Sequence, residues 1–370
     1  MAQIDEKDIN EIRNRADIVS VISRYIPVQK SGKSFRAVCP FHNDHDPSLN
    51  ISPEKQIYKC FVCGEGGNVF TFVQNYEKIS FVEAVKEVAD IVGYHLTYDV
   101  TAKKEIDPHK QALYKVLDEM IRFTMYELNT DIAKEEREYL EKRGLNDSIR
   151  EKFQIGFNPF NNSVYNFLKA KGYKDQDIVS TNIGKLTDSG IQDVFEGRIT
   201  FPIHDTNGNP IGFSARTLVK DTNSKYINTN DTEIFHKGTI VYNYHRAKNE
   251  ARRSAKIYLT EGVTDVIAFA RAGIDNCVCT LGTACTREQL LLLKNTTVKL
   301  VFCYDGDEAG QRATYKVASL ARSLGIEVSI IDNKTGKDPD EIIRDSGSEA
   351  LNDLVKKEIS WFEFLIHYLA

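Results

Sequence analysis

The stretch from Lys256 to Asp340 constrains the fold of this chain more than any other part of the sequence. It contains two apolar, β-rich runs, residues 257–260 and 300–303, and each run ends abruptly in acidic residues and glycine. A segment with helical periodicity follows each run, which is the pattern of buried parallel strands in an α/β sheet. Because ligands bind at the carboxyl-terminal edge of such sheets, the sequence predicts a functional site at that edge.

Carboxylates gather at the predicted edge in three clusters. Glu261 follows the first strand, Asp305 and Asp307 follow the second, and Asp338 and Asp340 come next along the chain. Acids brought together in this way repel one another unless divalent cations neutralise them, and hard oxygen ligands suit Mg or Mn. A lone Asp-x-Asp is more often only a turn. Three acidic clusters at successive strand ends favour a metal site instead.

Composition bounds the class of protein. The chain has 370 residues, of which 41% are apolar and 27% charged, as in a globular protein of two or three domains. Residues 1–8 lack the apolar core of a signal peptide, and no apolar run is long enough to span a bilayer. Seven cysteines concentrated in two places are typical of a reducing compartment, so we expect a cytoplasmic protein.

The first cysteine cluster has the spacing of a metal site. Cys39 and His42 form a C-x2-H pair, and Cys60 and Cys63 form a C-x2-C pair a hairpin's length further on. Four soft ligands in two such pairs can close the tetrahedron of a structural Zn site. His45 is a rival to His42, although its spacing from Cys39 is longer than usual. The remaining cysteines lie in or beside apolar runs and are predicted to be small buried hydrophobes: Cys277, Cys279, Cys285 and Cys303.

Local patterns predict the elements around the cysteine cluster. Apolar residues at helical spacing predict an amphipathic helix over residues 8–25, which Pro27 ends. Two more helices are expected over residues 68–76 and 80–92, the second with a capping box at its start and a glycine at its end. These elements would close a first domain near residue 97.

Beyond the first domain, the pattern changes twice. Residues 98–110 are polar and aperiodic and contain a proline, so they are predicted to form a linker. A helical segment is expected over residues 111–143. Two strand-like runs, residues 199–203 and 211–216, flank the turn sequence of residues 205–209 and predict a β-hairpin.

Basic and amide side chains follow this hairpin. The chain as a whole carries a net charge of −5, yet residues 205–256 contain nine Lys or Arg against five Asp or Glu. Arg and Lys neutralise phosphates, and neighbouring flat side chains can stack on bases or position them. By itself such a segment is more often a solvated basic face, but the acidic clusters downstream favour a nucleotide or a nucleic-acid backbone as its partner.

The motifs occur in an order that resembles one protein family. Cys39-x2-His42 with Cys60-x2-Cys63, residues 228–238, Glu261-Gly262, Asp305-x-Asp307 and Asp338-x-Asp340 resemble bacterial DnaG-type primases from about residue 5 to 345. The resemblance implies an α/β, multidomain α+β fold with a zinc-ribbon domain, a small mixed α/β lobe and a Toprim lobe built on a largely parallel sheet. The expected boundaries are 1–97 for the zinc ribbon, 98–110 for the linker, 111–250 for the N-terminal lobe, 251–345 for the Toprim lobe and 346–370 for the start of a helical subdomain.

The resemblance also assigns roles to residues. Cys39, His42, Cys60 and Cys63 would hold one structural Zn, and Glu261, Asp305, Asp307, Asp338 and Asp340 would form a Mg or Mn site. Glu261, Asp305 and Asp307 would be catalytic, and the sequence leaves open whether Glu261 ligates metal or accepts the proton of an attacking hydroxyl. The family's basic ridge for template and nucleotide corresponds to Arg143, Arg216, Lys225, Asn228 and Lys237.

The implied activity is that of a primase, a DNA-dependent RNA polymerase that makes short primers for replication by metal-dependent nucleotidyl transfer. Single-stranded DNA and ribonucleoside triphosphates would be its partners, with no membrane involved.

The sequence departs from the family pattern at two places. Residues 263–264 are Val-Thr where the family usually has Tyr-Met, and residues 229–231 are Thr-Asn-Asp where Ser-Pro-Glu is more typical. The family continues into a domain that binds the replicative helicase, and because this sequence ends at Ala370 we expect that domain to be absent.

Two other functions fit parts of the sequence. A Toprim lobe also occurs in nucleases and topoisomerases, although a topoisomerase needs a nucleophilic tyrosine and further gate domains. A non-catalytic zinc module that only binds single-stranded DNA would leave the acidic clusters without a purpose. Ribonucleotide incorporation that requires Mg or Mn on a single-stranded template would separate these functions.

Overall fold

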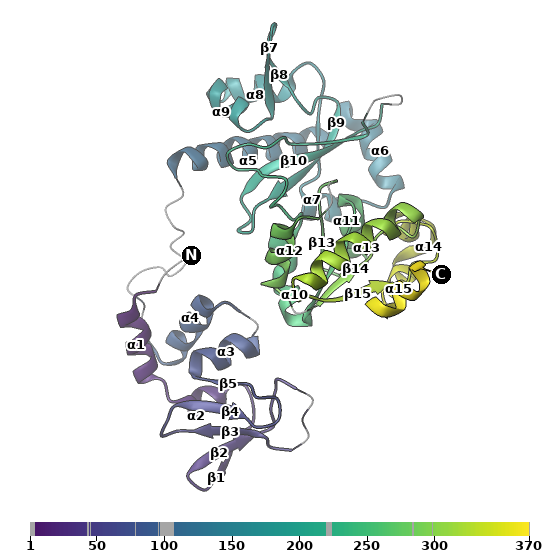
Figure 1. The fold of residues 1–370 in the computed structure, drawn as a ribbon. Helices are drawn as coiled ribbons and strands as arrows, with labels where there is room; N and C mark the ends of the chain where they lie inside the picture. Colours follow the sequence, from purple (N-terminus) through teal and green to yellow (C-terminus); the bar gives the residue numbers. More distant parts are fainter. Residues whose placement is uncertain are drawn as a thin grey trace. The chain divides into compact units, whose positions relative to one another are not determined.

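The computed structural model describes residues 4–42, 44, 46–77, 79–94, 96, 107–219, 224–282, 285–297 and 299–369. The chain divides into two compact units, residues 1–106 and residues 107–370, which Figure 1 draws in purple and in teal to yellow. Most of the predicted linker, residues 98–106, lies outside the described residues, as does His45. The finer division of the second unit into lobes stays a prediction.

The first unit is a small antiparallel sheet covered by helices. Its five strands are hydrogen-bonded in the order β1-β2-β3-β4-β5, and all neighbours are antiparallel. The core of this unit joins apolar side chains of the helices to Leu49, Ile51 and Tyr58 of the sheet. The elements are α1 (Glu6–Arg15), α2 (Ile18–Ile22), β1 (Gln29–Ser31), β2 (Ser34–Ala37), β3 (Leu49–Ser52), β4 (Ile57–Cys60), β5 (Gly66–Gly67), α3 (Val69–Glu77) and α4 (Phe81–Ile91).

The prediction of one helix over residues 8–25 is wrong, because the structure has two helices there. The backbone of Ala16 is extended, and the side chain of Asp17 accepts a hydrogen bond from the backbone N–H of Ser20 at 2.9 Å. An aspartate that caps a new helix ends the previous one, although the apolar spacing continues across the break. The two later helices are confirmed, and Ser80 and Glu83 form the expected capping box of α4.

The second unit opens with helices that pack on an antiparallel sheet of order β11-β10-β9-β6. The predicted hairpin is confirmed, with Ser214 of β10 opposite Phe201 of β9. The expected helix over residues 111–143 is broken by a short 3-10 turn. The elements are α5 (Pro108–Leu128), η1 (Asp131–Ala133), α6 (Lys134–Lys142), α7 (Asp147–Phe153), β6 (Gly156–Asn158), α8 (Ser163–Ala170), α9 (Asp175–Ser180), β7 (Gly184–Thr187), β8 (Gly190–Asp193), β9 (Arg198–His204), β10 (Pro210–Thr217) and β11 (Tyr226–Asn228).

The rest of the unit forms a second sheet of order β13-β12-β14-β15-β16, in which only the edge strand β16 is antiparallel. The predicted strands therefore pair in parallel, and Leu259 lies opposite Phe302. Helix α14 has a kink at Gly347. The elements are α10 (Tyr244–Ser254), β12 (Lys256–Thr260), α11 (Val263–Arg271), β13 (Cys277–Cys279), α12 (Arg287–Lys294), β14 (Lys299–Phe302), α13 (Glu308–Ser323), β15 (Glu327–Ile331), α14 (Pro339–Leu354), β16 (Glu358–Ser360) and α15 (Trp361–Leu369).

Helices cover both faces of this sheet, because its strands are apolar on both sides. Alternate residues point to opposite faces: Tyr258 and Val301 pack with α11 and α14, whereas Leu259 and Phe302 pack with α10, α12 and α13. The core under α11 and α14 continues into the antiparallel sheet through residues such as Phe201, so both sheets share one core. Among the described residues, no helix is long and apolar enough to cross a membrane.

Candidate metal centres and basic surface

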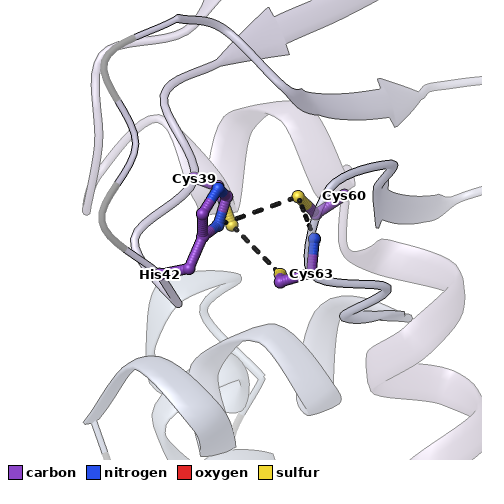
Figure 2. Close-up of side chains that lie close together, drawn as sticks. All are labelled: Cys39, His42, Cys60 and Cys63. Carbon is purple, nitrogen blue, oxygen red and sulfur yellow. Dashed lines mark hydrogen bonds between the residues drawn. The ribbon is translucent and has the colours of Figure 1, made fainter.

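The four predicted soft ligands lie together in the first unit. The sulfur and nitrogen atoms that Cys39, His42, Cys60 and Cys63 can offer all lie within 4.8 Å of one another, and Figure 2 shows the four side chains turned toward one another. The Sγ atoms of Cys39 and Cys63 are 3.8 Å apart. Zn–S bonds of about 2.3 Å in a tetrahedron place two sulfurs about 3.8 Å apart, so the side chains fit a tetrahedral zinc ion.

Local hydrogen bonds prepare two of these side chains for a metal. Burial alone would raise the pKa of Cys60, but the Ser48 hydroxyl and the backbone N–H groups of Cys63 and Val62 lower it to about 6. This favours the thiolate, which is the form that binds metal. The Nε2 atom of His42 lies 3.7 Å from the carboxylate of Asp44, which leaves Nδ1 on the side of Cys60. A carboxylate behind a ligating histidine commonly orients its ring.

The acidic residues meet at the carboxyl ends of β12 and β14, as the sequence predicts. Glu261 directly follows β12, and its Oε1 atom accepts a hydrogen bond from the backbone N–H of Asp305, just beyond β14, at 3.1 Å. Asp307 caps α13 by accepting from the N–H of Gly310 at 2.7 Å, and Asp338 caps α14 in the same way. The two caps place these carboxylates at the amino ends of helices, where the helix dipole favours negative charge.

Burial and mutual repulsion raise the pKa values of three partly buried acids of this cluster. The pKa of Asp305 is raised to about 7, first by burial and then by the charges of Glu261, Asp338 and Asp307. The pKa values of Glu261 and Asp338 are also raised, again mainly by burial. Acids in this setting are poorly neutralised by the protein itself, so a divalent cation fits their chemistry.

Two glycines make the acidic loop possible. A Cβ atom at Gly310 would lie 2.2 Å from the backbone oxygen of Asp305, and one at Gly306 would lie 2.5 Å from the backbone oxygen of Asn333. Real Cβ atoms do not come so close to backbone atoms. Helix α13 and the loop after β15 therefore press directly against the segment that carries Asp305 and Asp307.

Sequence reasoning missed one acid of this cluster, Asp265 in the first turn of α11. Its side chain is 4% exposed, and one carboxylate oxygen accepts from the N–H of Gly262 at 2.9 Å. The other oxygen has no hydrogen-bond partner among the described residues. Burial, followed by the charges of Asp338 and Asp305, raises the pKa of Asp265 well above its ordinary value. Its position three residues after Gly262, where a capping box places an acid, is the signal that could have revealed it.

The structure separates Asp340 from the other predicted metal ligands in one respect. The whole residue is 1% exposed, and its carboxylate is bound by the guanidinium group of Arg143, whose Nε donates at 3.1 Å. Sequence analysis had placed Arg143 on the basic ridge and Asp340 in the metal site. The fold brings the two together instead.

Two other ridge residues, Arg216 and Asn228, lie on the antiparallel sheet. Arg216 of β10 lies over the rings of Tyr139 and Tyr226, with its Cζ atom 5.0 and 5.1 Å from their centroids. Asn228, at the end of β11, donates to the backbone oxygen of Leu281 in the loop after β13 at 3.3 Å. This bond ties the antiparallel sheet to the parallel one.

The two predicted lysines are available to a ligand. Lys225 is exposed and Lys237 is partly exposed, and neither has an ion-pair partner within the described ranges. The backbone of Lys237 is held in place by Asp231 and Gln289. The prediction for the other cysteines is confirmed, since Cys277, Cys279, Cys285 and Cys303 are all buried.

Family comparisons match successive parts of the chain. Residues 4–104 match the CHC2 zinc finger, residues 123–248 match the N-terminal domain of the DNA primase catalytic core, and residues 258–343 match a Toprim-like domain. The Cys/His cluster lies in the first segment, and Glu261, Asp305 and Asp340 lie in the third. The order of the three matches is the order that the sequence motifs predict.

Individual relatives agree with the family matches. The DNA primase of Listeria monocytogenes is 37% identical over the whole chain, which spans 61% of that protein. The DNA primase of Aquifex aeolicus is 37% identical over 97% of the chain, which covers 70% of that protein. A crystal structure of the zinc-binding and RNA polymerase domains of the Aquifex primase aligns over 97% of this chain and 87% of that one, with a TM-score of 0.65.

A structure of the DnaG primase catalytic domain bound to single-stranded DNA aligns with 71% of this chain and 83% of its own, at 32% identity and a TM-score of 0.63. The relatives match the whole chain, and the metal-centre motifs lie in the corresponding family segments. This chain therefore belongs to the DNA primase family.

Proposed function

We propose that this chain synthesises short RNA primers on a single-stranded DNA template, in the cytoplasm, from ribonucleoside triphosphates. The observation that carries the proposal is the convergence of Glu261, Asp305, Asp307 and Asp338 at one sheet edge in a member of the primase family. The chain spans 61% of the length of the Listeria relative, so the activity of the complete protein is itself part of this proposal.

The four carboxylates would hold Mg or Mn. When bound, such ions stabilise the attacking 3′-hydroxyl and the leaving pyrophosphate in nucleotidyl transfer. In the protein alone, the raised pKa of Asp305 shows how unfavourable the gathered charges are, which supports a cation as their partner. Asp265 is buried beside this group, and the charges of Asp338 and Asp305 help to raise its pKa well above its ordinary value.

The protein's own residues would divide the remaining tasks. Lys225 and Lys237 would neutralise phosphates of template or nucleotide, since their side chains have no protein counter-charge within the described residues. Glu261 is a candidate to accept the proton of the attacking hydroxyl, because burial and neighbouring acids raise its pKa and so increase its basicity. Its hydrogen bond from the Asp305 N–H would fix its orientation.

The Cys/His cluster would hold one structural zinc ion. The zinc would replace a larger apolar core in a unit of about one hundred residues. The replicative helicase is a partner in the family, but its recruitment is not part of the function proposed for this chain.

The test is ribonucleotide incorporation on a single-stranded DNA template by the purified chain with Mg, with Mn and with EDTA. We expect RNA products a few nucleotides long that require one of the two ions and are lost in Asp305→Asn. DNA cleavage without RNA synthesis would favour a Toprim nuclease. Template binding without either reaction, in a folded protein with both metals supplied, would favour a non-catalytic binding module.

A further inference from the structure

Asp340 has an environment unlike that of the other acids at the sheet edge. Arg143 binds it through two nitrogens, and the guanidinium groups of Arg271 and Arg344 lie 3.9 and 3.7 Å from it. Asp338, two residues earlier, has no ion pair with an arginine within the described part of the chain, and it lies near the negative charges of Glu341 and Asp340 as well as the positive charge of Arg143. Three guanidinium groups therefore lie close to Asp340, whereas neither Asp305 nor Asp338 forms an ion pair with an arginine among the described residues.

A metal ion at Asp340 would have to displace Arg143. That guanidinium group is largely buried, with its side chain 13% exposed, and the carboxylate is 2% exposed. A charge left buried without its partner is strongly unfavourable. The pair also joins parts of the chain that are 197 residues apart, namely the end of α6 and the start of α14. Its geometry is that of a structural link between the end of α6 and the start of α14.

Arg143 leads directly to a second arginine of the basic ridge. Its Nη1 atom donates to the hydroxyl of Tyr139 at 2.6 Å. The ring of Tyr139 lies between the two arginines, with the Cζ atoms of Arg143 and Arg216 5.6 and 5.0 Å from its centroid. Arg216 in turn donates to the hydroxyl of Tyr226 at 2.9 Å. A continuous ladder of contacts thus runs from Asp340 through Arg143 and Tyr139 to Arg216 and Tyr226.

The backbone beside the ladder is also packed closely. Gly144, just after Arg143, has a φ of +72°, and a Cβ atom at this position would lie 2.3 Å from Nη2 of Arg271. The positive φ favours glycine at this position, and any larger residue would also have to move the end of the Arg271 side chain. Arg271 and Gly144 together hold the turn so that Arg143 faces Asp340.

We propose that Asp340 is a positioning residue, which holds Arg143 and, through Tyr139, Arg216 in the orientation that binds nucleotide or template phosphate, and that it does not ligate the catalytic metal. The inference rests on the proposed function for the identity of the ligand. It departs from the sequence-based assignment of Asp340 to the metal site. Its consequence is that removal of Asp340 damages substrate binding and leaves the metal site intact.

The test compares Asp340→Asn with Asp338→Asn in Mn(II) binding, measured by electron paramagnetic resonance, and in KM and kcat for ribonucleotides. We expect Asp340→Asn to bind Mn within about twofold of the wild type and to raise KM more than tenfold. Asp338→Asn should weaken Mn binding at least tenfold. Equal loss of Mn affinity in both variants would overturn the proposal.

A cycle with Arg143→Ala tests the ladder itself. If Asp340 acts through Arg143, the double variant should raise KM no more than Arg143→Ala alone, whereas independent effects would multiply and contradict the proposal. Tyr139→Phe keeps the ring and removes only the hydroxyl that Arg143 binds, so it should raise KM by a few fold with a wild-type melting temperature. This variant keeps the test meaningful if Asp340→Asn folds poorly. An unchanged KM in Tyr139→Phe would count against the ladder.

The proposed function can fail separately from this inference. If the wild type makes no RNA, the same variants are compared by Mn binding and by the affinity for a fluorescent single-stranded DNA and for a ribonucleoside triphosphate. Wild-type Mn binding with weakened ligand affinity in Asp340→Asn would still support positioning. Weakened Mn binding in that variant would overturn it whatever the reaction proves to be.

Discussion

The chain contains two candidate metal centres that are built on opposite principles. In the Cys/His cluster, four ligand atoms lie within 4.8 Å of one another and the Sγ atoms of Cys39 and Cys63 already have the spacing of a zinc tetrahedron. In the acidic cluster, the carboxylates are bound to separate backbone N–H groups at strand ends and helix starts. The first cluster brings four ligand atoms together from two short segments, whereas the second distributes its carboxylates over several strands and helices.

This difference follows from what each ion has to do. A structural zinc needs all its ligands from the protein, and the loops that supply them are otherwise short of apolar support. A catalytic ion must share its coordination with phosphate, so its protein ligands are few and are fixed on rigid elements. The comparison predicts that loss of metal unfolds the first unit and leaves the second folded but inactive.

The largest expected effect is that of breaking the zinc site. Cys60→Ser removes a thiolate from the cluster, so we expect the first unit to lose zinc and up to about 10 kcal/mol of apparent folding free energy. Zinc content and limited proteolysis measure the two effects, and residues 107–370 should survive digestion. Cys277→Ala, outside the cluster, should keep one zinc per chain. Stoichiometric zinc after replacement of Cys39, His42, Cys60 and Cys63 together would refute the assignment.

The next effect concerns catalysis in the second centre. Asp305→Asn and Asp307→Asn should each raise the activation free energy of primer synthesis by about 2 to 4 kcal/mol, and so slow the reaction, because each removes charge that would face the metal. Asn can still cap α13 at position 307, so the melting temperature should be unchanged or slightly higher. Asp188→Asn, on the exposed turn between β7 and β8, serves as the control. Full activity with a lowered melting temperature in Asp307→Asn would mean that the Asp-Gly-Asp is only a turn.

The acidic centre should also make the metal-free protein sensitive to pH. The pKa of Asp305 is raised to about 7 in the folded state, from an ordinary value of 3.8, so between these values the folded state binds more protons than the unfolded state. The free energy of unfolding should therefore fall as pH rises from about 4 to 7, by about 1 to 2 kcal/mol after allowance for partial exposure. Urea unfolding without added Mg or Mn, and without a chelator that would also remove zinc, measures this trend. Asp305→Asn should flatten it, and an identical slope in that variant would assign the effect to other groups.

The smallest effects are expected on the basic surface. Lys225→Ala and Lys237→Ala should each weaken binding of single-stranded DNA several-fold and reduce the salt dependence of log K by about 0.7, as expected for one lost phosphate contact. Fluorescence anisotropy over a range of salt concentrations measures both. Lys185→Ala, an exposed lysine on β7, should bind as the wild type does. If the three variants behave alike, the segment is a solvated face.

Much of the fold and of the two candidate centres could be predicted from the sequence, because the patterns that indicate them are local. Strands that are apolar on both faces predict a parallel sheet with helices on each face, and β12 and β14 do pair in parallel. The C-x2-H and C-x2-C pairs likewise define a cluster by spacing alone. The turn sequence of residues 205–209 was sufficient to predict the hairpin of β9 and β10.

Other features depend on contacts that no local pattern encodes. The hydrogen bond between Arg143 and Asp340 joins residues 197 positions apart. The charge of Arg143 also suits binding of phosphate, and that of Asp340 also suits binding of a metal, so the sequence alone does not indicate that they pair. Asp265 lies inside an apolar helical pattern, where only its burial beneath the other acids marks it as part of the centre. The break at Ala16 is hard to predict because the apolar periodicity continues across it, and the cap formed by Asp17 is the only local signal against one continuous helix.

Because Gly310 lies so close to the backbone of Asp305, substitutions at different positions of the acidic centre should affect the fold to different extents. Asparagine in place of an acid would leave the fold and remove the chemistry, whereas alanine in place of Gly310 would keep every acid and push apart the loop and helix that present them. A search for related centres that scores only the carboxylates would accept such a chain. Laboratory selection for activity should therefore reject substitutions at position 310 as firmly as those at position 305, although residue 310 carries no functional group.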